Sequence, residues 1–479
     1  MQEQEIKTKA ELKTLFETGD KPTQADFWAW LDAYWHKKEK IAMENISGLE
    51  NGLPNPSNIY AEIDEAGNAS LESYWVKKLF VKEGTQNIPD NFAAGMSLTD
   101  LEIPDSVITI GNGSFGSNRL KNITFSDNIT AIGNSAFSGN QLSNIKLPKY
   151  ITSISDSAFS NNRLEEINLP ANLISIGSAA FAGNQLTVLD IPDNVTSLGD
   201  YSFNANLLKE VKISKNLDRI GIGVFNSNQL ESIDLPDNII YIDNSAFSNN
   251  KLKDISLPKN LIKIGEYAFS GNLLSTISIP ENVTEIGYSA FNGNTLESIT
   301  LSQGLTKIRD YAFANNQITS VVIPDTVTEM GNQPFYNNPI KELGLPAGLT
   351  KITDSFLMNG QLLSLTIPKG IVEIGINAFN QNQLTELIIP ESVKTIQYYA
   401  FANNKLAKLE LPDAPLTIRS GAFMNNDLTE VVFPEGIAYI EYNSFTNNKL
   451  TQVTLGPNTQ YYSSSFDSNV EVTGGVFLG

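Results

Sequence analysis

One repeat governs most of this 479-residue chain. The segment LTDLEIPDSVITIGNGSFGSNR, residues 98–119, recurs every 22 residues without an insertion or a deletion. A phenylalanine column runs from Phe115 to Phe445 and is broken only at Leu357. An asparagine follows three residues after each of these positions, except at Gly360. Because a unit this short cannot bury an apolar face alone, the period predicts a solenoid of stacked turns.

The repeated columns predict ladders of identical side chains. Stacked phenylalanine rings add offset ring packing to the area that they bury. Asparagine at a tight corner offers a buried side-chain amide to backbone groups that the turn leaves unpaired. Both column breaks fall in residues 354–360, where DSFLMNG places phenylalanine and asparagine one residue early. The predicted ladder residues are Phe115, Phe137, Phe159 and Phe181, with Asn118, Asn140, Asn162 and Asn184.

The apolar pattern L-x-x-I-x-I/L predicts one short strand per repeat, as at Leu120, Ile123 and Phe125. A proline follows in most repeats and ends the strand, because it has no N–H for the ladder. A second apolar pair, Val107 and Ile110, is expected to cover the other side of the core. Eighteen strand positions are separated by seventeen steps of about 4.8 Å between neighbouring strands, which predicts a right-handed stack roughly 80 Å long.

The consensus L-x-x-I-x-I-P-x-x-V-x-x-I-G-x-x-A-F-x-x-N resembles the leucine-rich repeat of the BspA type, also called the treponemal class. Residues 233–236, Ile242, residues 246–247 and Asn250 carry the match, which spans roughly residues 76–470. This class often has a longer unit with cysteine at the corner, and asparagine here excludes a redox or disulfide role. The resemblance implies an open, curved leucine-rich-repeat solenoid used for binding and adhesion, without catalysis.

Composition restricts the function further. A net charge of −20 and a pI of about 4.5 disfavour partners that carry phosphate backbones or anionic headgroups, so no nucleic-acid binding is predicted. The chain has no cysteine and a single histidine, His36, which leaves little for thiol or acid–base chemistry. No phosphate loop, nucleophile elbow or zinc motif occurs. The chain is therefore predicted not to be an enzyme and to have no catalytic, metal or cofactor site.

The acidic residues that follow the strand proline could form a calcium ladder or ordinary turns. Lys149 and Lys259 interrupt this column, which favours turns. No window of 18 apolar residues occurs, so no membrane insertion is predicted, and residues 1–16 lack the apolar region of a Sec signal.

The first 53 residues differ from the repeats. Thr8 with Glu11 has the spacing of a capping box, and Thr23 precedes a second amphipathic segment, residues 24–38. Residues 1–53 are predicted to be a small α-helical adaptor, 54–75 a linker and N-terminal cap, 76–455 the solenoid, and 456–479 a C-terminal cap. The aromatic residues of segment 24–38 either pack on the first turn of the solenoid or form an attachment surface. The attachment residues under the second interpretation are Phe27, Trp28, Trp30, Tyr34 and Trp35.

Residues 8–41 resemble an N-terminal module of tail-fibre-like proteins in phages and prophages of Bacteroidetes-type hosts. The string GDKPTQ-x-x-FW-x-W-x-D-x-YWHK carries this resemblance. It implies a receptor-binding component of a phage or contractile injection particle, assembled in the cytoplasm and attached to baseplate or tail proteins. Such fibres are frequently trimers, so a trimer is the candidate oligomer. The alternative is a free BspA-type adhesin, secreted or on the cell surface, that binds host proteins or glycans.

The outward strand column that begins at Thr124 contains a candidate target-binding patch. This column is polar in the early repeats and apolar at three later positions, which could contact a cell-surface protein or glycan. The alternative is that strand-forming residues are simply tolerated there. The patch residues are Val322, Ile388 and Val432.

Overall fold

A computed structural model describes residues 58–63, 69–70 and 77–479 of the chain. The chain divides into two compact units, Met1–Ile59 and Tyr60–Gly479, and the second unit holds the repeats. The predicted adaptor of residues 1–53 lies outside the described residues. The same is true of Phe27, Trp28, Trp30, Tyr34, Trp35 and His36.

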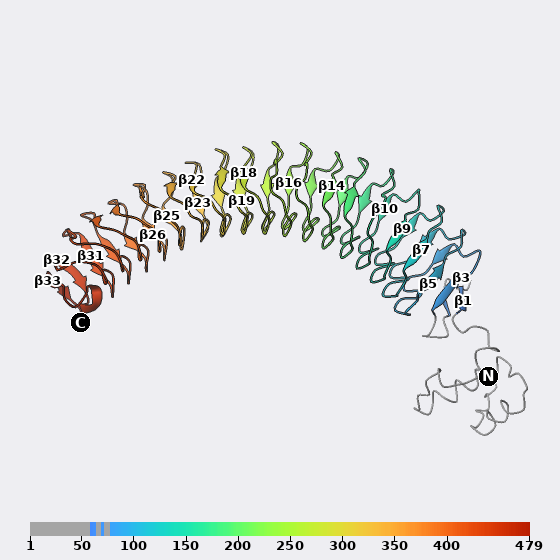
Figure 1. Ribbon diagram of the computed structural model, residues 1–479, viewed down its shortest axis with the longest axis horizontal. Helices are drawn as coiled ribbons and strands as arrows, with labels where there is room; N and C mark the ends of the chain where they lie inside the picture. Colours follow the sequence, from blue (N-terminus) through green and yellow to red (C-terminus); the bar gives the residue numbers. More distant parts are fainter. Residues whose placement is uncertain (1–57, 64–68, 71–76) are drawn as a thin grey trace, which may run out of the picture. The chain divides into compact units, whose positions relative to one another are not determined.

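Each repeat forms one turn of a solenoid, and successive turns of the second unit lie side by side along a curved stack (Figure 1). The predicted strand is present in most turns. In β7 (Asn122–Thr124) only the central Ile123 is buried, and it pairs in parallel with Ile145 of β9 (Asn144–Lys146). The 22-residue register between neighbouring strands confirms the predicted leucine-rich-repeat solenoid.

The second apolar pair of each repeat also forms a strand, which the sequence pattern did not predict. β6 (Thr109–Ile110) pairs in parallel with β8 (Ala131–Ile132). Ile110 and Ile132 are buried, whereas the residue before each of them faces outward. The turn is therefore bounded by two rows of parallel strands, and the second row presents a surface of its own.

The first row consists of three-residue strands after an initial four-residue strand. It contains β3 (Lys78–Val81), β5 (Asp100–Glu102), β7, β9, β12 (Val188–Asp190), β14 (Glu210–Lys212), β18 (Thr276–Ser278), β20 (Ser298–Thr300), β22 (Ser320–Val322), β24 (Glu342–Gly344), β27 (Glu386–Ile388) and β29 (Lys408–Glu410). The second row consists mostly of two-residue strands. It contains β4 (Asn87–Ile88), β6, β8, β10 (Ser153–Ile154), β11 (Ser175–Ile176), β13 (Ser197–Leu198), β15 (Arg219–Ile220), β16 (Tyr241–Ile242), β17 (Lys263–Ile264), β19 (Glu285–Ile286), β21 (Lys307–Ile308), β23 (Glu329–Met330), β25 (Lys351–Ile352), β26 (Glu373–Ile374), β28 (Thr395–Ile396), β30 (Leu416–Ile418) and β31 (Ile437–Ile440).

Other strands lie at the two ends of the repeats. Ahead of them come β1 (Asn58–Ile63) and β2 (Ala69–Ser70). After them come β32 (Gln452–Tyr461), the short 3₁₀ helix η3 (Ser463–Ser465) and β33 (Glu471–Phe477), which pairs in parallel with β32. Within the described ranges, no helix has the length and apolar character needed to cross a membrane.

Phenylalanine rings form a spine through the core. From Phe115 to Phe335 the rings are fully buried and stacked, with centroids of neighbouring rings 5.4–6.1 Å apart and interplanar angles of 3–25°. Phe466 has a sequence offset of 21 residues from Phe445, yet its ring stacks on Phe445 at 5.5 Å. The spine therefore extends beyond the last 22-residue repeat. The predicted spine residues Phe115, Phe137, Phe159 and Phe181 all lie in it.

Buried asparagine amides join each turn to the one before it. Asn250, for example, accepts a hydrogen bond at Oδ1 from the Leu230 N–H (3.0 Å). Its Nδ2 donates to the carbonyl of Phe225 in the preceding turn (2.9 Å) and of Phe247 in its own turn (3.1 Å). These bonds satisfy backbone groups that lie in the corner and have no strand partner. The same hydrogen bonds from Nδ2 to two phenylalanine carbonyls occur at Asn140, Asn162 and Asn184, while Asn118 bonds to Ala93 and Phe115.

Left-handed backbone residues on both sides of each phenylalanine turn the corner. Around Phe247 these residues are Ser245 (φ 57°) and Asn249 (φ 55°). The N–H groups of Ser245, Phe247 and Asn249 then donate to carbonyls of the following turn at 2.7, 2.9 and 2.8 Å. Glycine, asparagine and serine occupy most of these positions, because a β-branched side chain would be strained there.

The repeat that breaks the columns has a weaker junction with the turn before it. The Phe356 ring is tilted by 58° from Phe335 and by 48° from Phe379. Gly360 has no amide to offer, so the Ile340 N–H has no hydrogen-bond acceptor among the described residues. The equivalent Ile318 N–H one turn earlier donates to the Asn338 side chain at 3.1 Å.

Replacing Asn250 by alanine is expected to lower the free energy of unfolding by about 3 kcal/mol, because it leaves the buried Leu230 N–H without an acceptor and removes a donor from two carbonyls. Urea unfolding followed by circular dichroism would measure this change. The neighbouring substitution Gln229→Ala is the control and should change the stability by less than about 0.5 kcal/mol. Equal effects of the two substitutions would contradict a structural role for the asparagine amide.

The amide hydrogen of Ile340 is expected to exchange with solvent about five- to tenfold faster than that of Ile318, because only the latter has an acceptor. Residue-resolved hydrogen exchange by mass spectrometry compares the two within one sample. Equal protection at both positions would show that the junction is as tight as its neighbours.

Candidate binding surface

The predicted patch residues lie exposed on the first row of strands but do not adjoin one another. Val322, Ile388 and Val432 are 79%, 61% and 78% exposed. Val322 pairs with Gly344 in the next turn, and both Ile388 and Val432 pair with Glu410. The three side chains are therefore separated by small or charged residues and form no continuous apolar surface.

The second row of strands offers a more varied surface. Three sets of residues, each repeating every 22 positions, make it up: the strand column beginning at Thr109, the floor column beginning at Gly111, and the corner column beginning at Asn112. Side chains of the corner column hold the turns together by accepting hydrogen bonds from backbone N–H groups of the next turn. Asp156 N–H donates to Asn134 Oδ1 (3.2 Å), and Ser178 N–H donates to Asp156 Oδ1 (2.7 Å).

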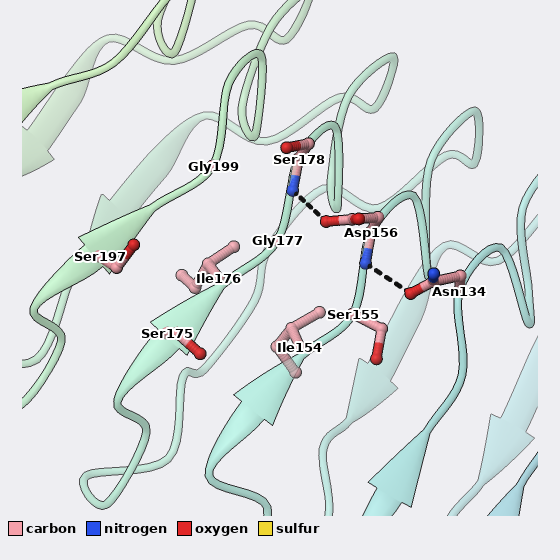
Figure 2. A pocket seen from close by; sticks show the side chains of 10 residues that line it. All are labelled: Asn134, Ile154, Ser155, Asp156, Ser175, Ile176, Gly177, Ser178, Ser197 and Gly199. Atoms are coloured by element: carbon pink, nitrogen blue, oxygen red, sulfur yellow. Dashed lines mark hydrogen bonds between the residues drawn. The ribbon is translucent and has the colours of Figure 1, made fainter.

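The N-terminal part of this surface contains a shallow, open hollow of about 300 Å³. Figure 2 shows Asn134, Asp156 and Ser178 in a row at the corner, with the serines of the strand column beside them. The hollow is lined by Asn134, Ile154, Ser155, Asp156, Ser175, Ile176, Gly177, Ser178, Ser197 and Gly199.

The middle of the same surface is covered by charged side chains that pair with one another. Asp243 belongs to the floor column and is buried. Its carboxylate accepts hydrogen bonds from Arg219 Nε (2.5 Å) and Lys263 Nζ (3.1 Å). The hydrogen bond to Asp243 raises the pKa of Arg219. Strand-column charges then alternate in sign over six turns, which satisfies each charge locally and leaves little net attraction for a partner. These residues are Lys263, Glu285, Lys307, Glu329, Lys351 and Glu373.

The C-terminal part of the surface carries aromatic rings. Tyr442 stacks on Tyr462 with ring centroids 3.9 Å apart, and the hydroxyl oxygens of Tyr439 and Tyr462 share a hydrogen bond of 2.9 Å. We refer to Tyr439, Tyr442 and Tyr462 as the tyrosine cluster. Beside it, the buried carboxylate of Glu441 pairs with Arg419 and accepts the Ser420 N–H at 3.0 Å. Tyr442 and the corner-column residue Tyr398 are 47% and 38% exposed.

Sequence reasoning missed the hollow and the grouping of Tyr439, Tyr442 and Tyr462 into one cluster. The signal was present in the floor column, where a larger side chain replaces glycine at Ser155, Asp243, Arg309, Thr353, Gln397, Arg419 and Glu441. Its meaning depends on knowing that the second apolar pair forms a strand. In the part of the chain that the structure describes, no group of three histidine or acidic side chains is placed to hold a metal ion.

The family model described as "BspA type Leucine rich repeat region (6 copies)" matches residues 86–207, 132–253, 241–362 and 350–473. No curated protein matches the sequence.

Several solved structures are similar to this chain. A leucine-rich repeat protein from Bacteroides ovatus ATCC 8483 is 21% identical with a TM-score of 0.49, and the match covers 84% of this chain and 92% of that one. YopM from Yersinia enterocolitica WA-314 is 21% identical with a TM-score of 0.44, covering 81% and 86%. A leucine rich cell surface protein from Faecalibacterium prausnitzii A2-165 is 21% identical with a TM-score of 0.38, covering 73% and 92%. These similarities concern the repeat fold alone.

Two rings of the tyrosine cluster, Tyr442 and Tyr462, are expected to ionise at a higher pH than a free tyrosine. The hydrogen bond with Tyr439, followed by burial and the nearby charge of Glu441, raises the pKa of Tyr462, and the hydrogen bond with Tyr462 raises the pKa of Tyr442. Since both values are raised by folding, the stabilisation is complete below the ordinary tyrosine pKa of about 10 and is lost as the pH rises through the folded values.

Titration of phenolate absorbance would test this, because Tyr439→Phe should let part of the signal appear at lower pH. The control Tyr150→Phe removes an exposed ring outside the cluster and should leave the titration of the cluster unchanged. An identical titration of the wild type and Tyr439→Phe would contradict the coupling.

Proposed function

Because the chain belongs to the BspA type leucine-rich repeat family, we propose that it is a non-enzymatic adhesion protein that binds a protein partner at a cell surface. Leucine-rich-repeat solenoids of this type typically bind partners. Secretion or display at the surface is part of the same proposal.

The tyrosine cluster is the observation that supports a protein partner most directly. Tyrosine combines a large apolar ring with a polar hydroxyl, loses little side-chain entropy on binding, and is enriched among residues that dominate binding energy. Tyr442 has almost half of its surface exposed although it stacks on Tyr462. The rings contribute nothing to the phenylalanine spine, which is complete beneath them.

The groups beside the cluster add polar specificity. Arg419 and Glu441 are paired with each other, so a partner meets rings and a neutralised ion pair instead of an isolated charge. Rings next to a paired arginine and glutamate suit a partner surface that is partly apolar and partly hydrogen-bonding. Val322, Ile388 and Val432 remain a second, separate prediction on the other row of strands.

The attachment to a phage or contractile injection particle rests on the resemblance of residues 8–41, which lie outside the described residues. It stays a prediction, as does the trimer. The family match supports the free adhesin more directly, because that match covers the repeats and not the first residues.

The test is binding of the full-length chain to a panel of purified extracellular-matrix and cell-surface proteins. The double variant Tyr398→Ser/Tyr442→Ser replaces both tyrosines with serine. Serine is chosen because the chain itself has Ser420 at the corner-column position between them. We expect its affinity for the bound protein to fall about tenfold or more. The matched control Tyr288→Ser, in the same column but outside the cluster, should bind like the wild type.

Two outcomes would contradict the proposal. One is that no protein of the panel binds while the chain is found on purified phage-like particles, which would favour the attachment interpretation. The other is that the double variant binds as well as the wild type, which would place Tyr442, the exposed ring of the tyrosine cluster, outside the interface.

A further inference from the structure

The strand-column residues at the hollow are smaller than those of the turns that directly follow it. Ser175 and Ser197 stand at positions that Arg219 and Tyr241 occupy in the next two turns. The floor glycines Gly177 and Gly199 are partly exposed, whereas Gly221 and Gly265 are buried. The chain therefore leaves open in one section a surface that it fills with its own side chains in the next.

From these features we infer that the hollow binds a neutral saccharide. This inference is independent of the tyrosine cluster and of the protein partner proposed above. The hollow would be a second binding site on the same row of strands.

Several hydrogen-bonding groups in the hollow have no partner among the described residues. They are the hydroxyls of three serines, one side-chain amide nitrogen and the second carboxylate oxygen of Asp156, whose first oxygen accepts the Ser178 N–H. A hydroxyl both donates and accepts, an amide nitrogen donates, and a carboxylate accepts. A ligand that matches this mixture must itself carry several groups that donate and accept, as a sugar does. The free groups belong to Ser175, Ser178, Ser197, Asn134 and Asp156.

The charge of the hollow argues against an anionic ligand. No lysine, arginine or histidine lines it, and its one charged group is the carboxylate of Asp156. A phosphate, sulfate or sialic acid group would be repelled by this carboxylate and would meet no cation. The net charge of −20 acts in the same direction.

The backbone of the hollow argues against an extended peptide. A peptide that adds to a sheet needs free N–H and C=O groups at a strand edge. Here Gly177 N–H donates to the Ile154 carbonyl (2.8 Å) and Gly199 N–H to the Ile176 carbonyl (2.7 Å). The side chains, not the main chain, are left to recognise a ligand.

The dimensions suit a short saccharide. The corner residues Asn134, Asp156 and Ser178 span two steps between turns, or about 10 Å at the usual spacing of parallel strands. Ile154 and Ile176 also line the hollow but are only 2% and 1% exposed, so recognition is left to the polar groups. A mono- to trisaccharide segment of a longer glycan would fill this space.

The experiment is a screen of the full-length chain against an array of neutral and anionic oligosaccharides, followed by calorimetry with the best neutral one. Ser175→Tyr and Ser197→Arg fill the hollow with the residue types that the chain already carries at Tyr241 and Arg219. We expect each to weaken saccharide binding about tenfold or more. Thr395→Tyr, in the same column outside the hollow, is the matched control and should change the affinity by less than about twofold.

A second variant separates a neutral ligand from a cationic one. Asp156→Asn keeps an oxygen for the Ser178 N–H, as Asn134 does for the Asp156 N–H, but removes the charge. We expect it to change the affinity for a neutral saccharide by less than about threefold. Tighter binding of a cationic amino sugar than of the neutral one, lost in Asp156→Asn, would mean that a cationic ligand is the occupant and would overturn the inference.

Three other results would also overturn it: binding of no neutral saccharide, preference for sulfated or sialylated ones, or binding that Ser175→Tyr and Ser197→Arg leave intact. Circular dichroism and the unfolding midpoint show whether each variant keeps the fold. The variant Tyr398→Ser/Tyr442→Ser should retain saccharide binding, and Ser175→Tyr should retain protein binding, so that failure at one site is distinguishable from failure at the other.

Discussion

The buried asparagine amide at each corner is the interaction on which the stacking of this chain depends. Each amide bonds to its own turn and to the preceding one, as Asn250 does with Phe247, Phe225 and Leu230. These bonds close only when the same atoms recur at the same place in each turn. An inserted residue between two corners would move the amide away from the backbone groups that need it, and those groups are buried. The constant 22-residue period is thus a requirement of the hydrogen bonds.

The phenylalanine spine adds area burial and ring packing to this framework, and both act between neighbouring turns only. Stability in such a stack is close to a sum of contributions from turns and from the junctions between them. The junction at Phe356 shows what the loss of one set of contacts means: tilted rings, and an Ile340 N–H without an acceptor in the described part of the chain. The second row is also interrupted here, since β23 and β25 do not pair. The stack continues because β22 still pairs with β24 in the first row, and the N–H groups of Gln333 and Asn337 still donate to carbonyls of the following turn.

Outward positions are free of these requirements, and there the turns differ. In the second row of strands one column holds Ser175 and Ser197, then Arg219, and finally Tyr439. Ser175 and Ser197 line a hollow, Arg219 forms an ion pair with the buried Asp243, and Tyr439 hydrogen-bonds within a cluster of rings. A single backbone geometry therefore presents three chemically different surfaces along one row, which is why we assign a saccharide to one section and a protein partner to another.

The amino-acid sequence by itself determined the fold class, because buried columns at a constant period admit only stacked turns. The predicted ladders were visible for the same reason: identical residues at a fixed spacing must meet when the turns stack. The second row of strands was not predicted, since two apolar residues per repeat are too few to show the alternation of a strand. The place of Phe466 in the spine was not predicted either. Phe466 lies 21 residues after Phe445 and appears out of register until the chain is folded. Only the tertiary structure decided which polar residues share a surface, because Ser175, Asp156 and Asn134 are ordinary turn residues until stacking brings them around one hollow.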